Sequence, residues 1–186
     1  MADLYCLPIS DRIGSGMVTD LVQIGRLGEK KRSENERLRR HFKRYGYVER
    51  KLRRIAEEIE ARIDCTVCAN CCRVATVRLR QRDVERMARF LGLTLAAFRE
   101  QYTAESDEEG LILRRGPSGC IFLSGTACQV YEARPGTCQD FPHLVRGAGS
   151  LESRMWEMAD RACYCPIVYN ALEAFKVETK FFEKSG

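Results

Sequence analysis

The chain has 186 residues, of which 45 % are hydrophobic and 31 % are charged. This composition is typical of a folded globular protein, and the length favours one domain or one domain with an appendage. No apolar run approaches the roughly 18 residues of a membrane span, and the first residues lack the pattern of a secretory signal. We therefore expect a cytoplasmic protein without a membrane contact, whose cysteines stay reduced.

The net charge of +5 comes from one segment of the chain. Between Arg26 and Arg62 there are fourteen Lys or Arg and seven Glu, a balance of +7, so the rest of the chain sums to −2. Apolar residues recur every three or four positions over 29–63, which predicts a long amphipathic helix that is weakest at Gly46.

The interleaved glutamates favour a helix that lies on its own domain with a solvated charged face, and they disfavour nucleic-acid binding. Two alternatives stay open. The helix over 29–63 packs on a macromolecular partner or on a second copy of the chain, or its clustered cations contact nucleic acid.

The other expected elements are short. Residues 1–28 carry weak signals and are expected to be an irregular segment. Alternating and helical apolar patterns then predict, in chain order, a strand over 74–79, helices over 82–91 and 94–102, an acidic loop over 104–110, hairpins between 111 and 131, a helical turn opened by Pro135, and a closing helix over 166–182.

Nine of the ten cysteines lie after residue 64. The first four, Cys65, Cys68, Cys71 and Cys72, form Cys-x2-Cys-x2-Cys-Cys. Five more follow at wider intervals: Cys120, Cys128, Cys138, Cys163 and Cys165. Two residues between cysteines let both thiolates converge on one centre, so this spacing recurs in zinc and iron–sulfur sites. The clustering argues against the alternative that these are simply small buried hydrophobic residues. Cys6 has no other cysteine at such a spacing, and we expect it to be a small buried hydrophobic residue.

The ligand pattern favours an iron–sulfur cluster over zinc. Steps of three residues match the start of the bacterial ferredoxin run, and Cys165-Pro166 supplies a remote Cys-Pro. Cys71 and Cys72 are adjacent, and neighbouring side chains point in different directions, so either two centres lie close together or one polynuclear cluster leaves a thiol spare.

Two residues beside the cysteines are weighed as further site residues. Arg134 is a candidate cofactor-binding residue, because its charge would neutralise thiolates or donate to a cluster sulfur. A turn-forming salt bridge is the equal alternative for Arg134. His143 follows Phe141-Pro142 near Cys138, and we expect it to be an exposed histidine rather than a metal ligand.

The sequence resembles the family of zinc- or iron-chelating cysteine-cluster proteins, named after the Cys-x2-Cys-x2-Cys-Cys motif. The resemblance covers 65 to about 168 and rests on that motif together with Asp83, Leu91-Gly92-Leu93, Cys120-Ile-Phe-Leu123, Cys128-Gln-Val-Tyr131, Arg134-Pro135-Gly-Thr-Cys138, Phe141-Pro142 and Cys165-Pro166. It implies metal binding through Cys65, Cys68, Cys71, Cys72, Cys120, Cys128, Cys138 and Cys165. Relatives of the family include iron–sulfur flagellin lysine methylases.

The sequence departs from the family pattern at two positions. Ala69 stands where the family usually has Gly after the second cysteine, so the loop is expected to be less tight. Cys163 is an extra thiol beside Cys165, which leaves the last ligand open between the two.

We therefore predict an α+β fold, in which a small irregular domain over 64–186 has short hairpins pinned by metal and covering helices, preceded by the long helix. The expected function is metal binding, as an iron–sulfur cluster or zinc, with a redox role or support of a macromolecular modification. The alternative is a zinc-stabilised binding module without catalysis, which presents the basic helix to nucleic acid or protein.

Overall fold

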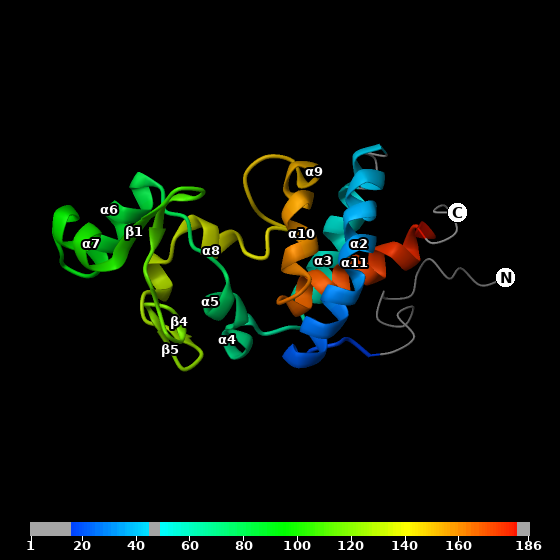
Figure 1. Ribbon diagram of the computed structural model, residues 1–186, viewed down its shortest axis with the longest axis horizontal. Coiled ribbons are helices and arrows are strands. Elements are labelled where there is room, and N and C mark those ends of the chain that lie inside the picture. Colours follow the sequence, from blue (N-terminus) through cyan, green and yellow to red (C-terminus); the bar gives the residue numbers. More distant parts are fainter. Residues whose placement is uncertain (1–15, 45–48, 182–186) are drawn as a thin grey trace. The chain divides into compact units, whose positions relative to one another are not determined.

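The computed structural model describes residues 16–44 and 49–181. The chain groups into two compact units, one formed by residues 1–64 with 142–186 and the other by residues 65–141. We call the first the helical unit and the second the cysteine unit (Figure 1). The sequence pattern suggests the divisions 1–28, 29–63 and 64–186, whereas the contacts of the fold place the last helix with the first ones.

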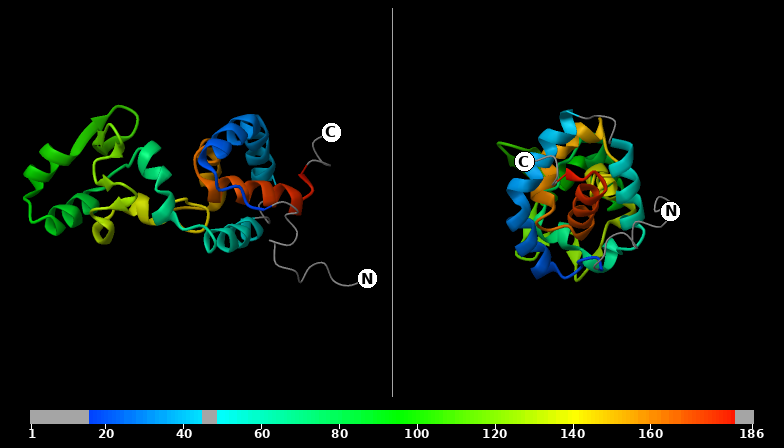
Figure 2. Two further views of the ribbon diagram at one scale, coloured as in Figure 1. Left: turned by 90° about the horizontal axis from the view of Figure 1, so that it is seen from below. Right: turned by 90° about the vertical axis from the view of Figure 1, so that its right-hand side faces the viewer.

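The described part of the helical unit is built from helices. Their bounds are α2 (Leu21–Arg44), α3 (Glu49–Glu60), α9 (Leu151–Arg154), the 3-10 helix η4 (Met155–Glu157), α10 (Met158–Arg161) and α11 (Pro166–Glu178). Helix α11 packs against α2, α3 and α10, and the right-hand view of Figure 2 shows it surrounded by these helices. No helix of the described residues is long and apolar enough to cross a membrane.

The helix expected over 29–63 is found as α2 and α3. Helix α2 begins before position 29, at Leu21, because the Asp20 carboxylate accepts a hydrogen bond from the Gln23 backbone N–H at 2.7 Å and so caps the first turn. Gly46, the expected weak point, lies outside the described residues, as does Cys6.

The core of the helical unit is large and apolar. The rings of Phe42 on α2 and Phe175 on α11 lie 5.8 Å apart, and both side chains are fully buried, as are Leu38 and Leu52. Burying each such side chain contributes about 1.5–3 kcal/mol. Helices α2 and α3 therefore lie on their own unit, as the amphipathic pattern predicts.

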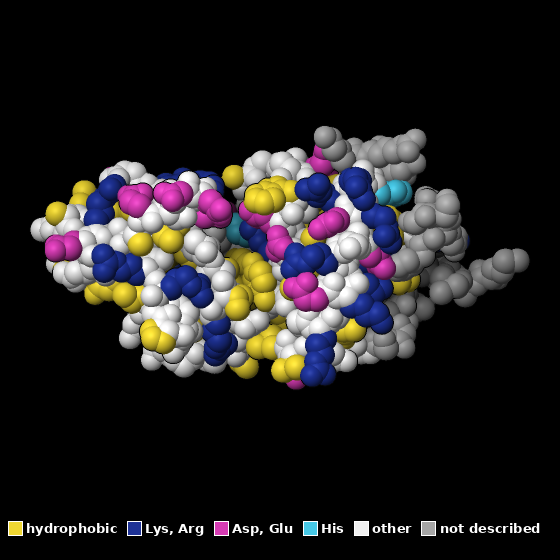
Figure 3. Space-filling view, in the orientation of Figure 1, with side chains coloured by type: hydrophobic (Ala, Val, Ile, Leu, Met, Phe, Trp, Pro, Cys, Tyr) yellow, Lys and Arg dark blue, Asp and Glu magenta, His cyan; other side chains and the backbone are white. Residues whose placement is uncertain are grey.

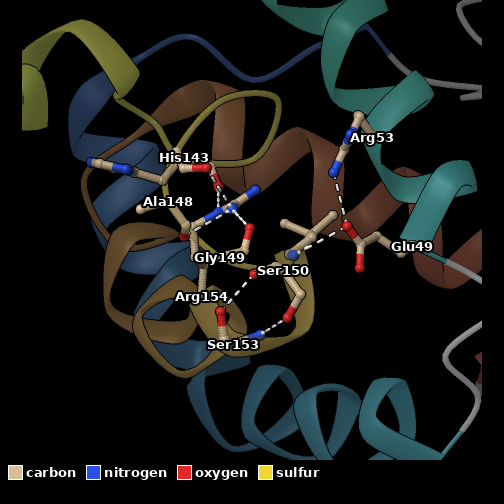
Figure 4. Close-up of polar contacts among 10 residues, drawn as sticks. Glu49, Arg53, His143, Ala148, Gly149, Ser150, Ser153 and Arg154 are labelled. Atoms are coloured by element: carbon tan, nitrogen blue, oxygen red, sulfur yellow. Dashed lines mark hydrogen bonds and ion pairs between the residues drawn. The ribbon is translucent and has the colours of Figure 1, made fainter.

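Arg154 holds the loop that returns to this core. Its guanidinium donates hydrogen bonds to the backbone carbonyls of His143, Gly147, Ala148 and Gly149 at 2.7–3.2 Å, as Figure 4 shows. Because the side chain is 8 % exposed, these carbonyls satisfy a charge that would otherwise be costly to bury.

The cysteine unit combines short helices with hairpins, which confirms the α+β prediction. Its elements are α4 (Cys65–Cys68), α5 (Asn70–Val74), α6 (Gln81–Phe90), α7 (Leu95–Tyr102), β1 (Thr103–Ser106), β2 (Gly110–Leu113), β3 (Arg115–Gly116), β4 (Gly119–Cys120), β5 (Leu123–Ser124), β6 (Ala127–Cys128), the 3-10 helix η3 (Tyr131–Ala133) and α8 (Gly136–Asp140). The strands pair as three antiparallel hairpins, β1–β2, β3–β4 and β5–β6.

Two expected elements differ from the structure. The strand expected over 74–79 is reduced to a bridge between Arg78 and Ile112, and Val74 ends helix α5 instead. The acidic loop expected over 104–110 begins as strand β1, because its backbone pairs with β2 even though its side chains are polar.

The apolar core of the cysteine unit is small and lies beneath the hairpins. The Tyr102 ring stacks on Phe122 with 4.9 Å between centroids, and Phe98 lies 5.4 Å from the same tyrosine. Val84 and Met87 from α6 complete the centre of this core. Three cysteines pack against its edge: Cys120, Cys128 and Cys138.

Candidate metal centre

Helices α4 and α5 carry the four-cysteine motif, and Ala69 joins them. Ala69 is 4 % exposed and adopts a left-handed conformation, with φ 46° and ψ 16°. Its backbone N–H donates to Cys65 O at 2.9 Å, and its carbonyl accepts from the Cys72 N–H at 3.1 Å. A left-handed residue here explains why the family usually has glycine at this position, and the chain makes the turn even with alanine.

Strand β4 lies directly against α5. A Cβ at Gly119 would lie 2.5 Å from the backbone oxygen of Cys72 and 2.7 Å from the Cα of Arg73. Only a glycine allows this approach, and its φ of +118° also favours glycine. The contact brings Cys120, the next residue, to the helix that carries Cys72.

Four thiols from four elements lie close enough for their charges to act on one another. They are Cys72 on α5, Cys120 on β4, Cys128 on β6 and Cys138 on α8. We call them the thiol cluster. Burial raises the pKa of Cys138 to about 12, and the charges of the other three thiols add to this effect.

Cys72 differs from the other three members of the thiol cluster. A hydrogen bond with the Cys71 side chain, opposed by burial and assisted by the charges of Arg73 and Arg134, lowers the pKa of Cys72 to about 6. Burial raises the pKa of both Cys120 and Cys128. The Cys71 hydrogen bond and the neighbouring arginines therefore favour the thiolate form of Cys72, whereas burial favours the neutral thiols of Cys120 and Cys128.

Arginines surround the thiol cluster. Arg134 acts electrostatically on Cys72, Cys128 and Cys138, and its guanidinium carbon lies 4.0 Å from the centroid of the Tyr131 ring. Arg134 therefore lies where its charge acts on three of the four thiols, and its role in cofactor binding stays a prediction.

Two more arginines tie the segments around the cluster together. The Arg73 guanidinium donates to Cys68 O at 2.8 Å and to Gly125 O at 3.1 Å, so it links α4 to the β5–β6 turn. Arg115 donates to the backbone carbonyls of Arg73 and Ala75, and its charge acts on Cys120.

Asp83 positions the helix that carries Cys138. This carboxylate is 1 % exposed, accepts from Arg86 at 2.8 Å, and accepts from the Gly136 backbone N–H at the start of α8 at 3.0 Å. Arg86 also donates to Arg134 O at 2.8 Å. Buried Asp83 and partly exposed Arg86 therefore hold the segment that contains both Arg134 and Cys138.

The remaining predicted ligands are placed differently. Cys65 is exposed and Cys68 is partly buried, and both lie on α4. Cys165 belongs to the helical unit, where it is 5 % exposed and precedes Pro166 at the start of α11. The structure thus brings together Cys71 and the thiol cluster, and places Cys165 in the other unit.

Cys163, the extra thiol, has partners of its own in the helical unit. Its sulfur accepts from Arg32 at 3.4 Å and donates to Ala159 O at 3.4 Å. Burial, together with a hydrogen bond to Glu29, raises the pKa of Cys163 to about 11 despite the charge of Arg32. These contacts connect α2 with α10, and the choice between Cys163 and Cys165 as the last ligand stays a prediction.

The donor set of the cysteine unit fits zinc or an iron–sulfur cluster in its chemistry. The nine described cysteines form no disulfide, and soft thiolate ligands suit both zinc and iron–sulfur clusters. Among the described residues, no three His, Cys, Asp or Glu side chains are arranged so that they could hold a metal ion. The thiols therefore lie near one another without surrounding a single metal position, as in sites whose final geometry forms with metal binding.

Sequence reasoning identified the thiols but not the residues that position them. Asp83 was noted only as part of the family pattern, and its bond to Gly136 spans a separation in sequence that no local signal reveals. Gly119 gives only a turn signal in the sequence, because its contact with Cys72 depends on how strand β4 packs against helix α5. The basic side chains of Arg73 and Arg115 gave no signal at all.

Comparison with known families matches the CxxCxxCC model, described as a putative zinc- or iron-chelating domain, over residues 64–166. The match covers the whole cysteine unit and continues into the helical unit as far as Pro166. Neither the curated proteins nor the solved structures gave a match.

Proposed function

Because this chain belongs to the CxxCxxCC family of zinc- or iron-chelating domains, we propose that it holds an iron–sulfur cluster through thiolates of the cysteine unit. The observation that supports this proposal is the gathering of the thiol cluster from α5, β4, β6 and α8 beside Arg134. Four thiolates are the usual ligand set of such a cluster.

The cysteine spacing, rather than the number of thiols, favours iron–sulfur over zinc. Steps of three residues at Cys65, Cys68 and Cys71 match the start of the bacterial ferredoxin run, whereas a structural zinc site and a single iron–sulfur cluster both take four ligands. Cys71 adjoins Cys72 in sequence and hydrogen-bonds to it. These two thiols therefore lie together, although the side chains of adjacent residues generally point in different directions. The full set of eight ligands that the family resemblance implies, Cys165 included, stays a prediction.

The protein's own residues would set the properties of a bound cluster. An iron–sulfur cluster supplies one-electron transfer at a potential governed by charge, hydrogen bonds to sulfur and exposure. Arg134 and Arg73 contribute positive charge, and Asp83 fixes the segment that holds Arg134. Electron transfer and support of a macromolecular modification are both roles of this chemistry.

Metal analysis of anaerobically purified protein tests the proposal. We expect a brown protein that contains iron and acid-labile sulfide in equal amounts. Cys72→Ser and Cys138→Ser should each lose most of the iron, whereas Cys163→Ser, the matched control in the helical unit, should keep it. A colourless protein that contains zinc alone would reject the iron–sulfur assignment, and iron loss in Cys163→Ser alone would reject the ligand set.

A further inference from the structure

Helix α2 presents a row of cations along its exposed side. Arg26, Lys30, Arg37 and Arg40 are all exposed, and their spacing of four, seven and three residues keeps them on one face of a helix. We call this row the basic stripe. From Arg26 to Arg40 it extends about 21 Å at 1.5 Å per residue. Figure 3 shows Lys and Arg side chains along α2, with acidic side chains beside some of them.

The members of the basic stripe form no ion pair within the described part of the chain. The other basic residues of α2 with described ion pairs are Lys31, which pairs with Glu34 and Glu173, and Arg32, which pairs with Glu29 and Asp160. Among the α2 side chains that the structure describes, the basic residues without an ion pair, Arg39 included, are therefore all exposed.

Most of the glutamates that interleave with these cations in the sequence form ion pairs with residues outside the basic stripe. Glu34 accepts from the buried Lys176 at 2.6 Å. Glu29 receives a two-point contact from Arg32 at 2.8 and 2.9 Å. Glu36 is the one exposed glutamate of α2 without an ion pair among the described residues. The argument from sequence against nucleic-acid binding requires that all of these glutamates neutralise the neighbouring cations.

Helix α3, in the same unit, pairs three of its four basic side chains, and only the exposed Arg50 has no ion pair among the described residues. Lys51 pairs with Glu178 at 3.1 Å, Arg53 with Glu49 at 2.8 Å, and Arg54 with Glu58 at 3.5 Å. A surface ion pair of this kind leaves little net charge for a partner. The difference between the two helices marks the basic stripe as a specific feature of α2.

We infer that the basic stripe of α2 is a binding surface for the phosphate backbone of double-stranded DNA, read without base specificity. Three of the four cations are arginines, whose planar guanidinium suits phosphate oxygens. An α-helix, about 10–12 Å across, matches the roughly 12 Å major groove of B-DNA. The exposed Ser33 lies between Lys30 and Arg37 and adds a hydroxyl of the kind that contacts phosphates.

Other polyanions fit this surface less well. Membrane-surface helices insert an apolar face, but Ile24, Leu38 and Phe42 of α2 are fully buried in the unit. Single-stranded nucleic acid is bound by aromatic stacking, and His41 packs edge-on against Phe181 instead. Duplex RNA has a deep, narrow major groove, whereas the wider major groove of B-DNA admits an α-helix.

Fluorescence anisotropy with a labelled 20-base-pair DNA duplex of arbitrary sequence tests the inference on the full, metal-loaded chain. Four phosphate contacts predict a slope of log K against log salt of about −3.6, or roughly a 100-fold loss of affinity between 50 and 200 mM salt. Arg37→Gln with Arg40→Gln should reduce the slope by about 1.8. Lys51→Gln with Arg54→Gln, which removes the same charge from paired positions, should leave it unchanged.

Three results would overturn the inference. The first is an absence of binding at 50 mM salt. The second is an equal reduction of the salt slope in the α2 and α3 double variants, which would show that binding depends only on the net charge of the protein. The third is tighter binding to phosphatidylserine vesicles, duplex RNA or polyglutamate than to the DNA duplex, which would assign the stripe to another partner.

Discussion

In the helical unit the side chains sealed from solvent are large and apolar, Phe42, Phe175 and Leu52 among them, and they come from three helices. In the cysteine unit a smaller apolar core around Phe98 and Phe122 lies beneath two-residue strands. Short hairpins of this kind are marginal alone. The contrast indicates that one unit is ordered by hydrophobic burial and that the other relies on its thiols and what they bind.

Removal of the metal should therefore have the largest effect, and it should destabilise the cysteine unit much more than the helical unit. A structural metal contributes an apparent 10–16 kcal/mol in small zinc domains. On chelation of the reduced protein, we expect amides of residues 115–140 to lose their hydrogen-exchange protection while those of α11 keep theirs. Equal loss in both units would show that the helical unit depends on the metal as well.

A matched pair of glycine substitutions places the same clash in each unit. A Cβ at Gly28 would lie 2.5 Å from the Cα of Cys163, and a Cβ at Gly119 would lie 2.5 Å from the oxygen of Cys72. Gly119→Ala should lower metal content, because it pushes β4 away from α5. Gly28→Ala should cost up to about 3 kcal/mol of stability through overpacking with metal content unchanged.

Metal analysis and urea unfolding of the two variants measure these outcomes side by side. Loss of metal in Gly28→Ala but not in Gly119→Ala would reverse the assignment of the two units.

A buried charge in the helical unit gives a pH-dependent test. Lys176 is fully buried and pairs with Glu34 and Glu173. Burial alone would raise the pKa of Glu34, but the hydrogen bond and charge of Lys176, with those of Lys31, lower it overall. The stabilisation is therefore complete above the unfolded-state pKa, near 4.3, and is lost as the pH falls through the lower folded-state pKa.

Glu34→Gln should cost about 2 kcal/mol at neutral pH, because it leaves the buried Lys176 with Glu173 as its remaining described carboxylate. Urea unfolding as a function of pH measures this, and the difference between the variant and the parent chain should shrink below about pH 4. Iron content should not change at neutral pH. A pH-independent difference would contradict the ion-pair explanation.

Ala69→Gly gives the smallest expected effect, and it acts on the cysteine unit. A left-handed conformation costs a non-glycine residue about 1–2 kcal/mol, partly offset by the greater unfolded-state entropy of glycine. We expect stabilisation by up to about 1 kcal/mol, measured by unfolding of the metal-loaded protein. Destabilisation by the substitution would contradict the left-handed turn between α4 and α5.

Local patterns predicted much of the secondary structure. Thr94 caps α7, with its hydroxyl accepting from the Ala97 N–H at 3.2 Å, and Pro166 stands in the first turn of α11. Both signals act within a few residues, and for this reason they can be read from sequence. The strand expected over 74–79 was wrong because Val74 ends helix α5, so only 77–79 reach β2. There Leu79 N–H donates to Leu111 O at 2.8 Å and Leu113 N–H donates to Val77 O at 2.9 Å.

The sequence by itself determined the chemistry of this protein: soft thiolate ligands at metal-binding spacing, and an excess of positive charge over 26–62. The tertiary structure decided which of these groups act together. Asp83 fixes the start of α8 across the cysteine unit, and Lys176 draws Glu34 away from the exposed face of α2. Spacing is a local property of the chain, whereas pairing and burial depend on contacts between residues far apart in sequence, which form only when the chain packs.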